Sequence, residues 1–491
     1  MKKVTLRTIA LSGVLLCGKF ADAQIQKGND IDGETTGDRS GFAVSMPDSN
    51  TIAIGAPQND ANGGSSGQVR IYNWSGSAWT QKGLDLDGDA ANDLFGGTIS
   101  MPDANTVAIG APQNDGTDLD AGQVKIFTWN GSAWQLKGSV LQGEASPGFF
   151  GYLFGSSVSM PDANTIGVSS PWHDANGIFS GQVEVFDWNG SDWVQRGTSI
   201  NGAVASYSGS AISMPSANVV AIASQGGTTG NTGQVKIYQW DGASWIQKGN
   251  SIIGEANADY SGSSISMPDD NTIAIGAEDN DGSFPQAGHV RIFQWNGSSW
   301  VQKGADIDGE AQNDKSGDSV SMPNANTVAI GAIANNGQAG HTRIYAWNGA
   351  NWMQVGVDID GEAPLDQSGH SVSMPNPGTV AIGAIQNDGN GNEAGHVRIY
   401  DLSHLLGVEV NRFENPFSVY PNPTKDKFIL AGIPDAEGVS LVLRNIHGQE
   451  IWKKSNVSTD KPELEIKGGS GIYFLEITAQ DKKSVVKIVK E

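Results

Sequence analysis

Acidic side chains recur in short clusters along this 491-residue sequence and are its first candidates for binding a cation. One cluster, Asp30-Ile31-Asp32-Gly33-Glu34, reappears at residues 85–89, 306–310 and 358–362, but it has lost carboxylates at 142–144, 201–203 and 253–255. A second set lies in other loops, at Asp115, Asp118 and Asp120 and at Asp279, Asn280 and Asp281. Calcium takes six to eight oxygen ligands, so the clusters raise a hypothesis of calcium binding. Their decay in three copies favours solvated turns instead, in which Asp and Gly serve the backbone geometry.

Three histidines, His289, His341 and His396, occupy one repeat position, which is Gln in four other copies: Gln68, Gln123, Gln182 and Gln234. A residue that exchanges with Gln favours a hydrogen-bonding strand position over a metal ligand. Nothing in the sequence resembles a Ser-His-Asp set, a zinc-binding His pair or a phosphate-binding loop. We therefore predict no catalytic residues, no metal ligands and no cofactor, with calcium as the one cation left open.

One segment breaks the repeat symmetry by adding aromatic residues: Phe149, Phe150 and Tyr152. The same repeat unit contains Trp172 and His173, and Trp172 is the one repeat tryptophan outside a pair. Exposed apolar clusters are usually interaction sites, so these five residues are the candidate ligand-binding residues. The alternative is that they pack onto their own unit.

The element that must position these loops is a repeat marked by Ser-Met-Pro, at Ser45, Ser100, Ser159, Ser213, Ser266, Ser321 and Ser373. Each unit shows four short segments of strand character, for example 97–101, 106–111, 123–129 and 133–137. Seven four-strand units at this spacing predict an all-β, seven-bladed β-propeller. An open solenoid is the alternative fold.

The two ends of the repeat array favour the closed ring. Six units end in a strand that reads roughly Trp-x-Gln-Lys-Gly, and the seventh lacks it. A similar segment, Gln24–Gly28, precedes the first unit, so we expect this N-terminal strand to complete the last blade and remove its exposed edge.

Within each unit, the first strand is predicted to be innermost, with Ser lining a narrow channel and the Pro ending the strand. Six pairs of tryptophans five residues apart flank Asn-Gly-like turns, as Trp129 and Trp134 do. Such turns favour tight hairpins, so we expect these pairs to clamp the outer hairpins, although an aromatic sugar-binding array is the alternative.

The repeats resemble a known family in Phe95-Gly96 followed by Gly110-Ala111-Pro112, the signature of FG-GAP repeats of integrin-type propellers. The resemblance covers roughly residues 24–400, and all seven copies are similar to the FG-GAP-like repeats of bacterial secreted proteins. In the integrin type, a loop between the first two strands carries a D-x-D-x-D-G calcium site. Here that loop is only Pro-Asp-Ala-Asn or a variant of it, so the calcium site is not carried over.

The chain ends are predicted to direct export. Residues 1–23 have a basic start, an apolar run and a small-x-small ending, which predicts a signal peptide cleaved between Ala23 and Gln24. It contains Cys17, the single cysteine, so disulfides and thiol chemistry are excluded from the mature chain.

Residues 401–414 read as a linker, and 415–491 as seven short strands of a small Ig-like β-sandwich. This segment resembles the C-terminal sorting domain of type IX secretion cargo, in the Por secretion tail family. The matching residues are Tyr420, Pro421, Asn422 and Pro423, then Gly471, Ile472 and Tyr473, and finally Lys487 and Lys490. The resemblance implies the type IX machinery and its sortase as partners, and a product of a Gram-negative bacterium that is released or attached to surface lipopolysaccharide.

The charge distribution limits the partners further. The chain carries −23 overall, of which residues 1–23 contribute +3 and residues 411–491 contribute +1, so the repeats carry about −27. This argues against nucleic acid and anionic membranes as partners. We expect a monomeric, secreted or cell-surface adhesion module that binds a glycan or a protein. The alternatives are an extracellular polysaccharide lyase or hydrolase that uses acidic loop residues, and a purely structural surface protein.

Overall fold

The computed structural model describes residues 24–148, 150–226, 230–405, 417–431, 439–445, 450–455, 457, 461–479 and 482–491. The chain divides into two compact units, Met1–Leu406 and Gly407–Glu491. The predicted signal peptide with Ala23, the aromatic Phe149 and residues 406–414 of the predicted linker lie outside the described residues. Gln24 and the other candidate site residues lie within them.

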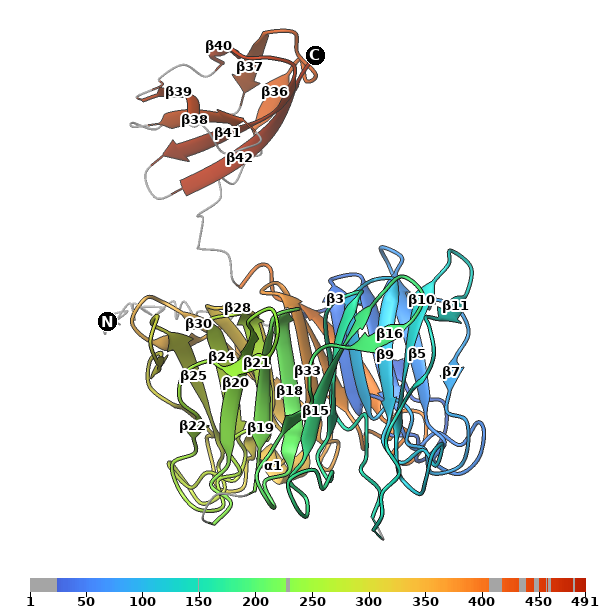
Figure 1. The fold of residues 1–491 in the computed structure, drawn as a ribbon. Coiled ribbons are helices and arrows are strands. Elements are labelled where there is room, and N and C mark those ends of the chain that lie inside the picture. Colours follow the sequence, from blue (N-terminus) through green and yellow to red (C-terminus); the bar gives the residue numbers. More distant parts are fainter. Residues whose placement is uncertain are drawn as a thin grey trace, which may run out of the picture. The chain divides into compact units, whose positions relative to one another are not determined.

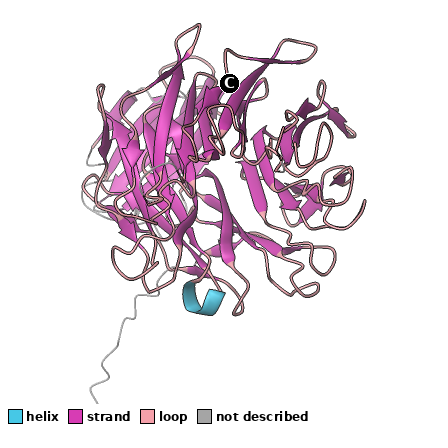
Figure 2. Cartoon of the chain, turned by 60° about the horizontal axis from the view of Figure 1, so that its bottom comes forward, coloured by secondary structure: helices cyan, strands magenta, loops and turns pink. Residues whose placement is uncertain are grey.

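The first unit is a ring of seven antiparallel sheets, the blades, which stand around a common centre (Figures 1 and 2). In blade 1 the strands run from the centre outward as β3 (Ala43–Asp48), β4 (Thr51–Ala56), β5 (Gln68–Trp74) and β6 (Trp79–Gln81). The predicted seven-bladed propeller is confirmed.

The other blades repeat this order. Blade 2 contains β8 (Thr98–Asp103), β9 (Thr106–Ala111), β10 (Gln123–Trp129) and β11 (Trp134–Leu136); blade 3 contains β13 (Val158–Asp162), β14 (Thr165–Ser170), β15 (Gln182–Trp188) and β16 (Trp193–Gln195); blade 4 contains β18 (Ser208–Ser216), β19 (Val219–Ser224), β20 (Gln234–Trp240) and β21 (Trp245–Gln247). Blade 5 contains β23 (Ile265–Asp269), β24 (Thr272–Ala277), β25 (His289–Trp295) and β26 (Trp300–Gln302); blade 6 contains β28 (Ser316–Asn324), β29 (Thr327–Ala332), β30 (His341–Trp347) and β31 (Trp352–Gln354); blade 7 contains β33 (Ser368–Asn376), β34 (Thr379–Ala384) and β35 (His396–Asp401).

The acidic connectors between blades form a fifth, two-residue strand that the sequence did not predict. In blade 1, β7 (Leu86–Asp87) pairs with β5 beside β6, through Gln68↔Asp87 and Val69↔Leu86. The equivalents are β2 (Ile31–Asp32), β12 (Leu141–Gln142), β17 (Ile200–Asn201), β22 (Ile252–Ile253), β27 (Ile307–Asp308) and β32 (Ile359–Asp360). Each acidic cluster is therefore held against the third strand of a blade.

The ring closes as predicted, by a strand from the N-terminus. β1 (Ile25–Gln26) pairs antiparallel with β35, with Ile25 opposite Asp401 and Gln26 opposite Tyr400. Lys27 continues the ladder, because its N–H donates to the carbonyl of Ile399 at 2.7 Å. The outer edge of blade 7 is covered by this pairing.

The inner strands are joined around the centre by one repeated hydrogen bond. The Met N–H of each Ser-Met-Pro donates to the Ser hydroxyl of the preceding blade, at 2.9–3.0 Å in all seven junctions. The bond from Met46 to Ser373 joins the first blade to the last. The expectation that the Pro ends the strand is wrong: β3 continues through Pro47 to Asp48 with a register shift after Ser45. Pro cannot donate to the ladder, and the irregularity accommodates it.

Adjacent blades pack a small face against a branched face. Ala53 of blade 1 lies in one buried cluster with Val107 and Ile109 of blade 2. Close approach is needed here, because a Cβ on Gly55 would lie 2.0 Å from the carbonyl oxygen of Gly96 in the next blade. The alternation of branched and small residues in the second strand thus determines how closely the blades approach.

The tryptophan pairs join neighbouring blades at the outer edge of the ring. The indole of Trp134 donates to the carbonyl of Lys82 at 2.8 Å, and the Lys82 ammonium lies 5.2–5.3 Å from the ring centres of Trp129 and Trp134. Five other junctions repeat the indole bond. The prediction that these tryptophans are structural clamps is confirmed.

The second unit is a two-sheet β-sandwich, as predicted. One sheet has the order β36 (Ser418–Tyr420), β37 (Lys427–Ala431) and β40 (Glu463–Glu465), and the other β39 (Glu450–Lys454), β38 (Ser440–Asn445), β41 (Gly471–Ala479) and β42 (Lys482–Lys490). Phe428, Leu441 and Leu475 are among the residues of its buried core. Among the described residues the only helix is α1 (Asn335–Gln338), and none is long and apolar enough to cross a membrane.

The closing strand provides a test of the ring. Hydrogen-bonding residues alternate along an antiparallel strand, so the bond of the Lys27 N–H implies that the N–H of Ile25 points at Asp401. The substitution Ile25→Pro removes this N–H. We expect a loss of roughly 1–3 kcal/mol in the free energy of unfolding of the propeller, because a strand hydrogen bond is lost and its acceptor is left unpaired. The measurement is urea unfolding followed by tryptophan fluorescence.

The matched control is Ile25→Thr, which keeps the N–H and changes a side chain that is 58% exposed. Equal stability of the Pro and Thr variants would mean that the pairing of β1 contributes nothing to the ring.

Candidate functional site

Four aromatic side chains gather from three loops. Phe150 lies between β12 and β13, Trp172 and Phe179 lie between β14 and β15, and Tyr207 lies between β17 and β18. The loop between β14 and β15 corresponds to the loop of blade 6 that contains α1, which Figure 1 labels. The ring centre of Phe150 lies 6.1 Å from those of Trp172 and Phe179, and the Trp172 and Phe179 rings are 5.8 Å apart. Phe179 stacks on Tyr207 at 5.4 Å with an interplanar angle of 18°. We call Phe150, Trp172, Phe179 and Tyr207 the aromatic patch.

The aromatic patch is open to solvent at its centre and rim. Phe150 is 60% exposed, and the neighbouring Ile178 and Val204 are 65% and 59% exposed. Trp172, Phe179 and Tyr207 are half-buried. Ring contacts thus join aromatic side chains from three separate loops, with the exposed Phe150 among them. Exposed apolar clusters are commonly interaction sites.

The five residues predicted to bind a ligand divide between surface and interior. Phe150 and Trp172 lie in the aromatic patch, whereas Tyr152 and His173 are buried against each other with ring centres 4.2 Å apart. The predicted Phe149 lies outside the described residues. Tyr152 and His173 therefore pack in the interior, beneath the exposed Phe150.

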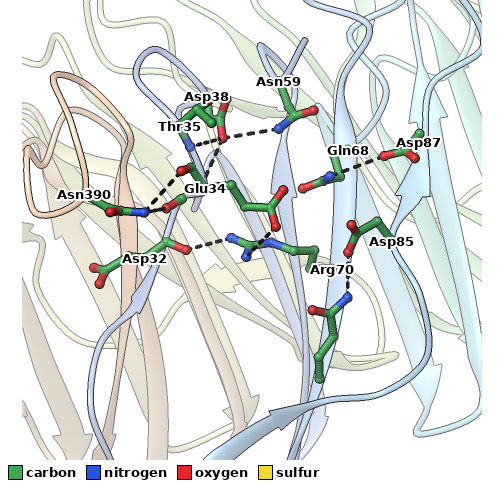
Figure 3. Close-up of polar contacts among 12 residues, drawn as sticks. Asp32, Glu34, Thr35, Asp38, Asn59, Gln68, Arg70, Asp85, Asp87 and Asn390 are labelled. Atoms are coloured by element: carbon green, nitrogen blue, oxygen red, sulfur yellow. Dashed lines mark hydrogen bonds and ion pairs between the residues drawn. The ribbon is translucent and has the colours of Figure 1, made fainter. Parts of the chain in front are cut away.

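His173 takes the place of a repeated structural asparagine. In blade 1, Asn59 donates to Asp38 at 3.2 Å, and Asp38 also accepts the N–H groups of Glu34 and Thr35 (Figure 3). In blade 3, His173 Nε2 lies 3.3 Å from Glu144 Oε2 instead. At the junction between blades 2 and 3, an imidazole–carboxylate contact thus replaces the amide–carboxylate hydrogen bond.

Sequence analysis missed Phe179 and Tyr207, which occupy a position pair found at every blade junction. In each pair the second residue donates its N–H to the carbonyl of the first, and both have positive φ. The pairs are Ser65 with Leu94, Asp120 with Leu153, Phe179 with Tyr207, Asn231 with Tyr260, Gln286 with Lys315, Gln338 with Gln367, and Glu393 with Arg39. Alignment of the seven units would have revealed Phe179 as the one aromatic residue at the first position of these seven pairs.

The loop carboxylates also have structural partners. The side chains of Asp60, Asp115, Asp174, Asp281 and Asp388 each accept the N–H of the residue five positions later, at 2.7–2.9 Å. In blade 1, Arg70 donates to the carbonyl of Asp32 at 2.7 Å and lies 3.6 Å from Glu34 (Figure 3). Much of the acidic character of the loops thus belongs to turns and to contacts between blades.

Glu184 breaks this pattern beside the junction between blades 2 and 3. It occupies the position held by Arg70 in blade 1 and by Lys125 in blade 2, where Lys125 contacts Asp89 at 2.6 Å. Burial raises the pKa of Glu184. A hydrogen bond from Ser199 lowers this pKa, and the negative charge of Glu144 raises it further. Raised carboxyl pKa values are common at catalytic sites but also occur in structural networks.

A second buried carboxyl, Asp318, lies on the innermost strand of blade 6. Burial, followed by the neighbouring Glu278 carboxyl, raises its pKa well above the ordinary value. His370 Nδ1 lies 3.8 Å from Asp318 Oδ2, and the Phe42 ring covers the imidazole at 4.7 Å. Burial and the charge of Arg39 lower the pKa of His370 to about 4.

His289, His341 and His396, which were interpreted as hydrogen-bonding strand residues, begin the third strands β25, β30 and β35. Each is 1% exposed. Each lies in a group with two carboxylates whose candidate ligand atoms are within 4.8 Å of one another. The structure therefore brings together residues that were considered separately in the sequence.

The sorting motifs lie together within the second unit. Asn422 donates to the carbonyl of Lys487 at 2.9 Å and accepts the N–H of Val489 at 2.8 Å. Lys490 donates to the carbonyls of Ile466 and Gly468 and contacts Asp426 at 2.8 Å. The hydroxyl of Tyr473 donates to the carbonyl of Gly469 at 2.7 Å.

The buried His370 predicts a pH effect on stability. An unfolded histidine has a pKa of about 6.5, so between that value and about 4 the unfolded chain binds a proton that the folded chain excludes. Stability should fall as the pH drops from 7 to 4. The variant His370→Ser, which has the residue found in blades 3–5, should lose roughly 2–3 kcal/mol less over this range. The assignment would be contradicted if the free energies of unfolding of the two proteins, measured by urea denaturation, fell equally between pH 7 and pH 4.

The comparisons with known proteins assign the second unit. Residues 418–491 match the family model described as a secretion system C-terminal sorting domain. No curated protein sequence matches the chain.

Solved structures similar to the chain are distant. They include an acylaminoacyl peptidase (10% identity, TM-score 0.40, 80% of this chain and 58% of the peptidase), Sqt1 from Chaetomium thermophilum (15%, 0.41, 76% and 90%) and the β-propeller domain of the trilobed protease from Pyrococcus furiosus (8%, 0.40, 70% and 90%). The alignment thus spans little more than half of the peptidase. The sorting domain identifies the chain as a type IX secretion substrate, directed to the cell surface or the extracellular space.

Proposed function

We propose that this protein is a non-catalytic binding module that attaches to a glycan or a protein through the aromatic patch. The observation that carries the proposal is the 60% exposed Phe150 among three aromatic side chains from separate loops. Exposed aromatic rings suit the apolar face of a sugar ring or an apolar side chain of a protein.

The arrangement of the scaffold supports a binding role. The hydrogen bonds between blades repeat at every junction, whereas the residue pair that includes Phe179 and Tyr207 differs at each one. Rigid frameworks with variable loops commonly carry binding sites. The protein thus has a constant frame and one junction specialised for contact.

We further propose the details of export and family that the sequence suggests. The repeats are FG-GAP-like, residues 1–23 are a signal peptide, and a sortase removes the sorting domain. The product is a monomer that is released or linked to surface lipopolysaccharide.

A second candidate function is an extracellular polysaccharide lyase or hydrolase. It is favoured by Glu184, whose pKa is raised by burial near Glu144 at the junction that also supports the patch. An enzyme would use such a carboxyl as a general acid. A binding module leaves a bound polysaccharide intact, whereas a lyase or hydrolase cleaves it, so analysis of the products separates the two functions.

The binding function is tested by replacing patch residues with those of sister blades. The triple variant combines Trp172→Gln, Phe179→Asn and Phe150→Ala. Gln and Asn occur at the first two positions in other blades, and Phe150 lies in an insertion and is exposed, so the variant should fold normally. We expect at least a tenfold weaker affinity for the ligand found by screening glycan and matrix-protein arrays, with an unchanged melting temperature. The matched control is Leu365→Ala, an equally exposed apolar residue on another connector (56%).

A large loss of stability in the triple variant would assign the aromatic side chains to the core. Cleavage of a bound polysaccharide, abolished by Glu184→Gln while binding persists, would replace the binding module with the enzyme.

The sorting domain is tested in a bacterium that has type IX secretion. A chain that ends at residue 405 should accumulate in the periplasm, whereas the full chain should reach the cell surface or the medium, as measured by immunoblots of cell fractions. Equal extracellular amounts would contradict the role of residues 418–491. Periplasmic chain of both lengths should remain resistant to protease, which controls for misfolding.

A further inference from the structure

Three blade junctions contain the same arrangement of one imidazole and converging carboxylates. Each joins a histidine on the third strand of a blade, an Asp from the connector that follows and a Glu from the connector that precedes. The sets are His289 with Asp306 and Glu255, His341 with Asp358 and Glu310, and His396 with Asp30 and Asp32. Glu362 also lies near the third set, 4.0 Å from Nδ1 of His396.

The distances place the imidazole at the centre of each group. Nδ1 of His396 lies 3.7 Å from Asp30 Oδ2 and 4.0 Å from Glu362 Oε2. Nδ1 of His341 lies 3.7 Å from Asp358 Oδ2, and that of His289 4.0 Å from Asp306 Oδ2. These separations are too long for hydrogen bonds. Ligand atoms around a tetrahedral zinc ion, at bonds of about 2.0–2.2 Å, lie about 3.3–3.5 Å apart. The His–Asp pairs at 3.7–4.0 Å and the other ligand atoms, which lie within 4.8 Å of one another, would therefore have to move closer together around the ion.

The second observation is that two of these histidines, His341 and His396, are buried and have ring nitrogens without a hydrogen-bond partner. Among the described residues, neither ring nitrogen of His396 has a partner, nor does Nε2 of His341. Both side chains are at least 98% buried. A buried polar group without a partner is costly. At His396 the unpartnered Nδ1 is the atom that faces the carboxylates, which indicates that a ligand satisfies it there.

The other blades show what the same position does without a histidine. Gln68 donates to Asp87 at 3.3 Å, Gln123 to Asp89 at 2.8 Å and Gln182 to Asn201 at 3.2 Å. Gln thus reaches the connector side chain directly. His is too short and rigid to do so and leaves a gap between its nitrogen and the carboxylates.

The neighbouring arginine fixes the Glu and leaves one of its oxygens for a ligand. Arg398 donates to the carbonyl of Asp360 at 2.6 Å and lies 3.7 Å from Glu362 Oε1, whereas Oε2 faces His396. Arg343 and Arg291 repeat these contacts with Glu310 and Glu255. Carboxylates held by an outer partner are a common feature of metal sites.

Solvent reaches the carboxylates through hollows beside the connectors. A hollow of about 320 Å³ is lined by Asp30, Asp32 and Trp79, among others, and one of about 200 Å³ by Asp306 and Asp308. An ion can therefore reach the groups of His396 and His289 from outside the ring.

We propose that these three junctions bind divalent transition-metal ions, of which Zn²⁺ is the type best matched by one imidazole and two or more carboxylates. Calcium and magnesium take oxygen ligands, whereas imidazole suits zinc and its neighbours in the first transition row. The site at blade 7 has a further role, because Asp30 and Asp32 come from the N-terminal segment and His396 from the end of the repeats. An ion there ties together the two segments that close the ring.

The test is titration of the full chain with ZnCl₂ after dialysis against EDTA, followed by isothermal calorimetry and metal analysis. We expect three ions per chain. His396→Gln should bind two, and the triple variant with His289→Gln and His341→Gln should bind none, or at least tenfold more weakly. Gln is the residue of the sister blades, so these variants should fold, and the single variants decide the result if the triple one does not.

The control is His173→Asn, which removes a buried histidine outside the three groups and introduces the residue found in sister blades. It should still bind three ions. Zinc should also raise the melting temperature of the wild type, and His396→Gln should remove most of that increase. Binding that is unaffected by the triple variant, binding of less than one ion per chain at 100-fold molar excess, or binding of CaCl₂ but not ZnCl₂ would each overturn the proposal.

Discussion

The hydrogen bond from each Met N–H to the Ser hydroxyl of the preceding blade is the contact on which the ring depends. It joins only innermost strands, where seven strands of the chain converge. Ser supplies an acceptor in little space, and the register shift after it lets the following Pro pass without a donor. Since the bond is made between blades, no blade satisfies its inner strand alone. The units are therefore stable as a closed set.

The outer contacts follow from this inner one. Once the inner strands converge, the blades fan outward, and the gap between them widens with distance from the centre. Small and branched faces fill it near the middle, as Ala53 against Val107 does. Tryptophans and lysine stems fill it at the periphery, where Gly83 has to lack a side chain because the rings of Trp129 and Trp134 lie against it. Connector carboxylates and basic residues fill it at the loop face.

The sequence predicted those features that repeat. The blade number, the closing strand and the roles of the paired tryptophans follow from spacing, because seven copies reveal which residues the fold needs. It did not predict contacts between positions that are distant in the chain. Phe179 and Tyr207 meet through positive-φ loops, and periodicity carries no information about this geometry. The fifth strands were missed because a two-residue segment such as Ile31–Asp32 has no period. The exchange of Gln for His looked conservative because the convergence of the connector carboxylates is visible only in three dimensions.

The pairing of Ile25 with Asp401 has a consequence for the order of events during biogenesis. It is a contact of nearly maximal sequence separation for the unit, and such contacts form late because a long chain must first be ordered. During synthesis, the first residues of the ring have to wait until the last repeat has emerged from the ribosome. Throughout that interval, blade 7 has no outer strand and the chain is still open. The outer edge of β35 is therefore the last edge of the ring to be covered, and the closed set of blades exists only once both ends of the repeat region have been made.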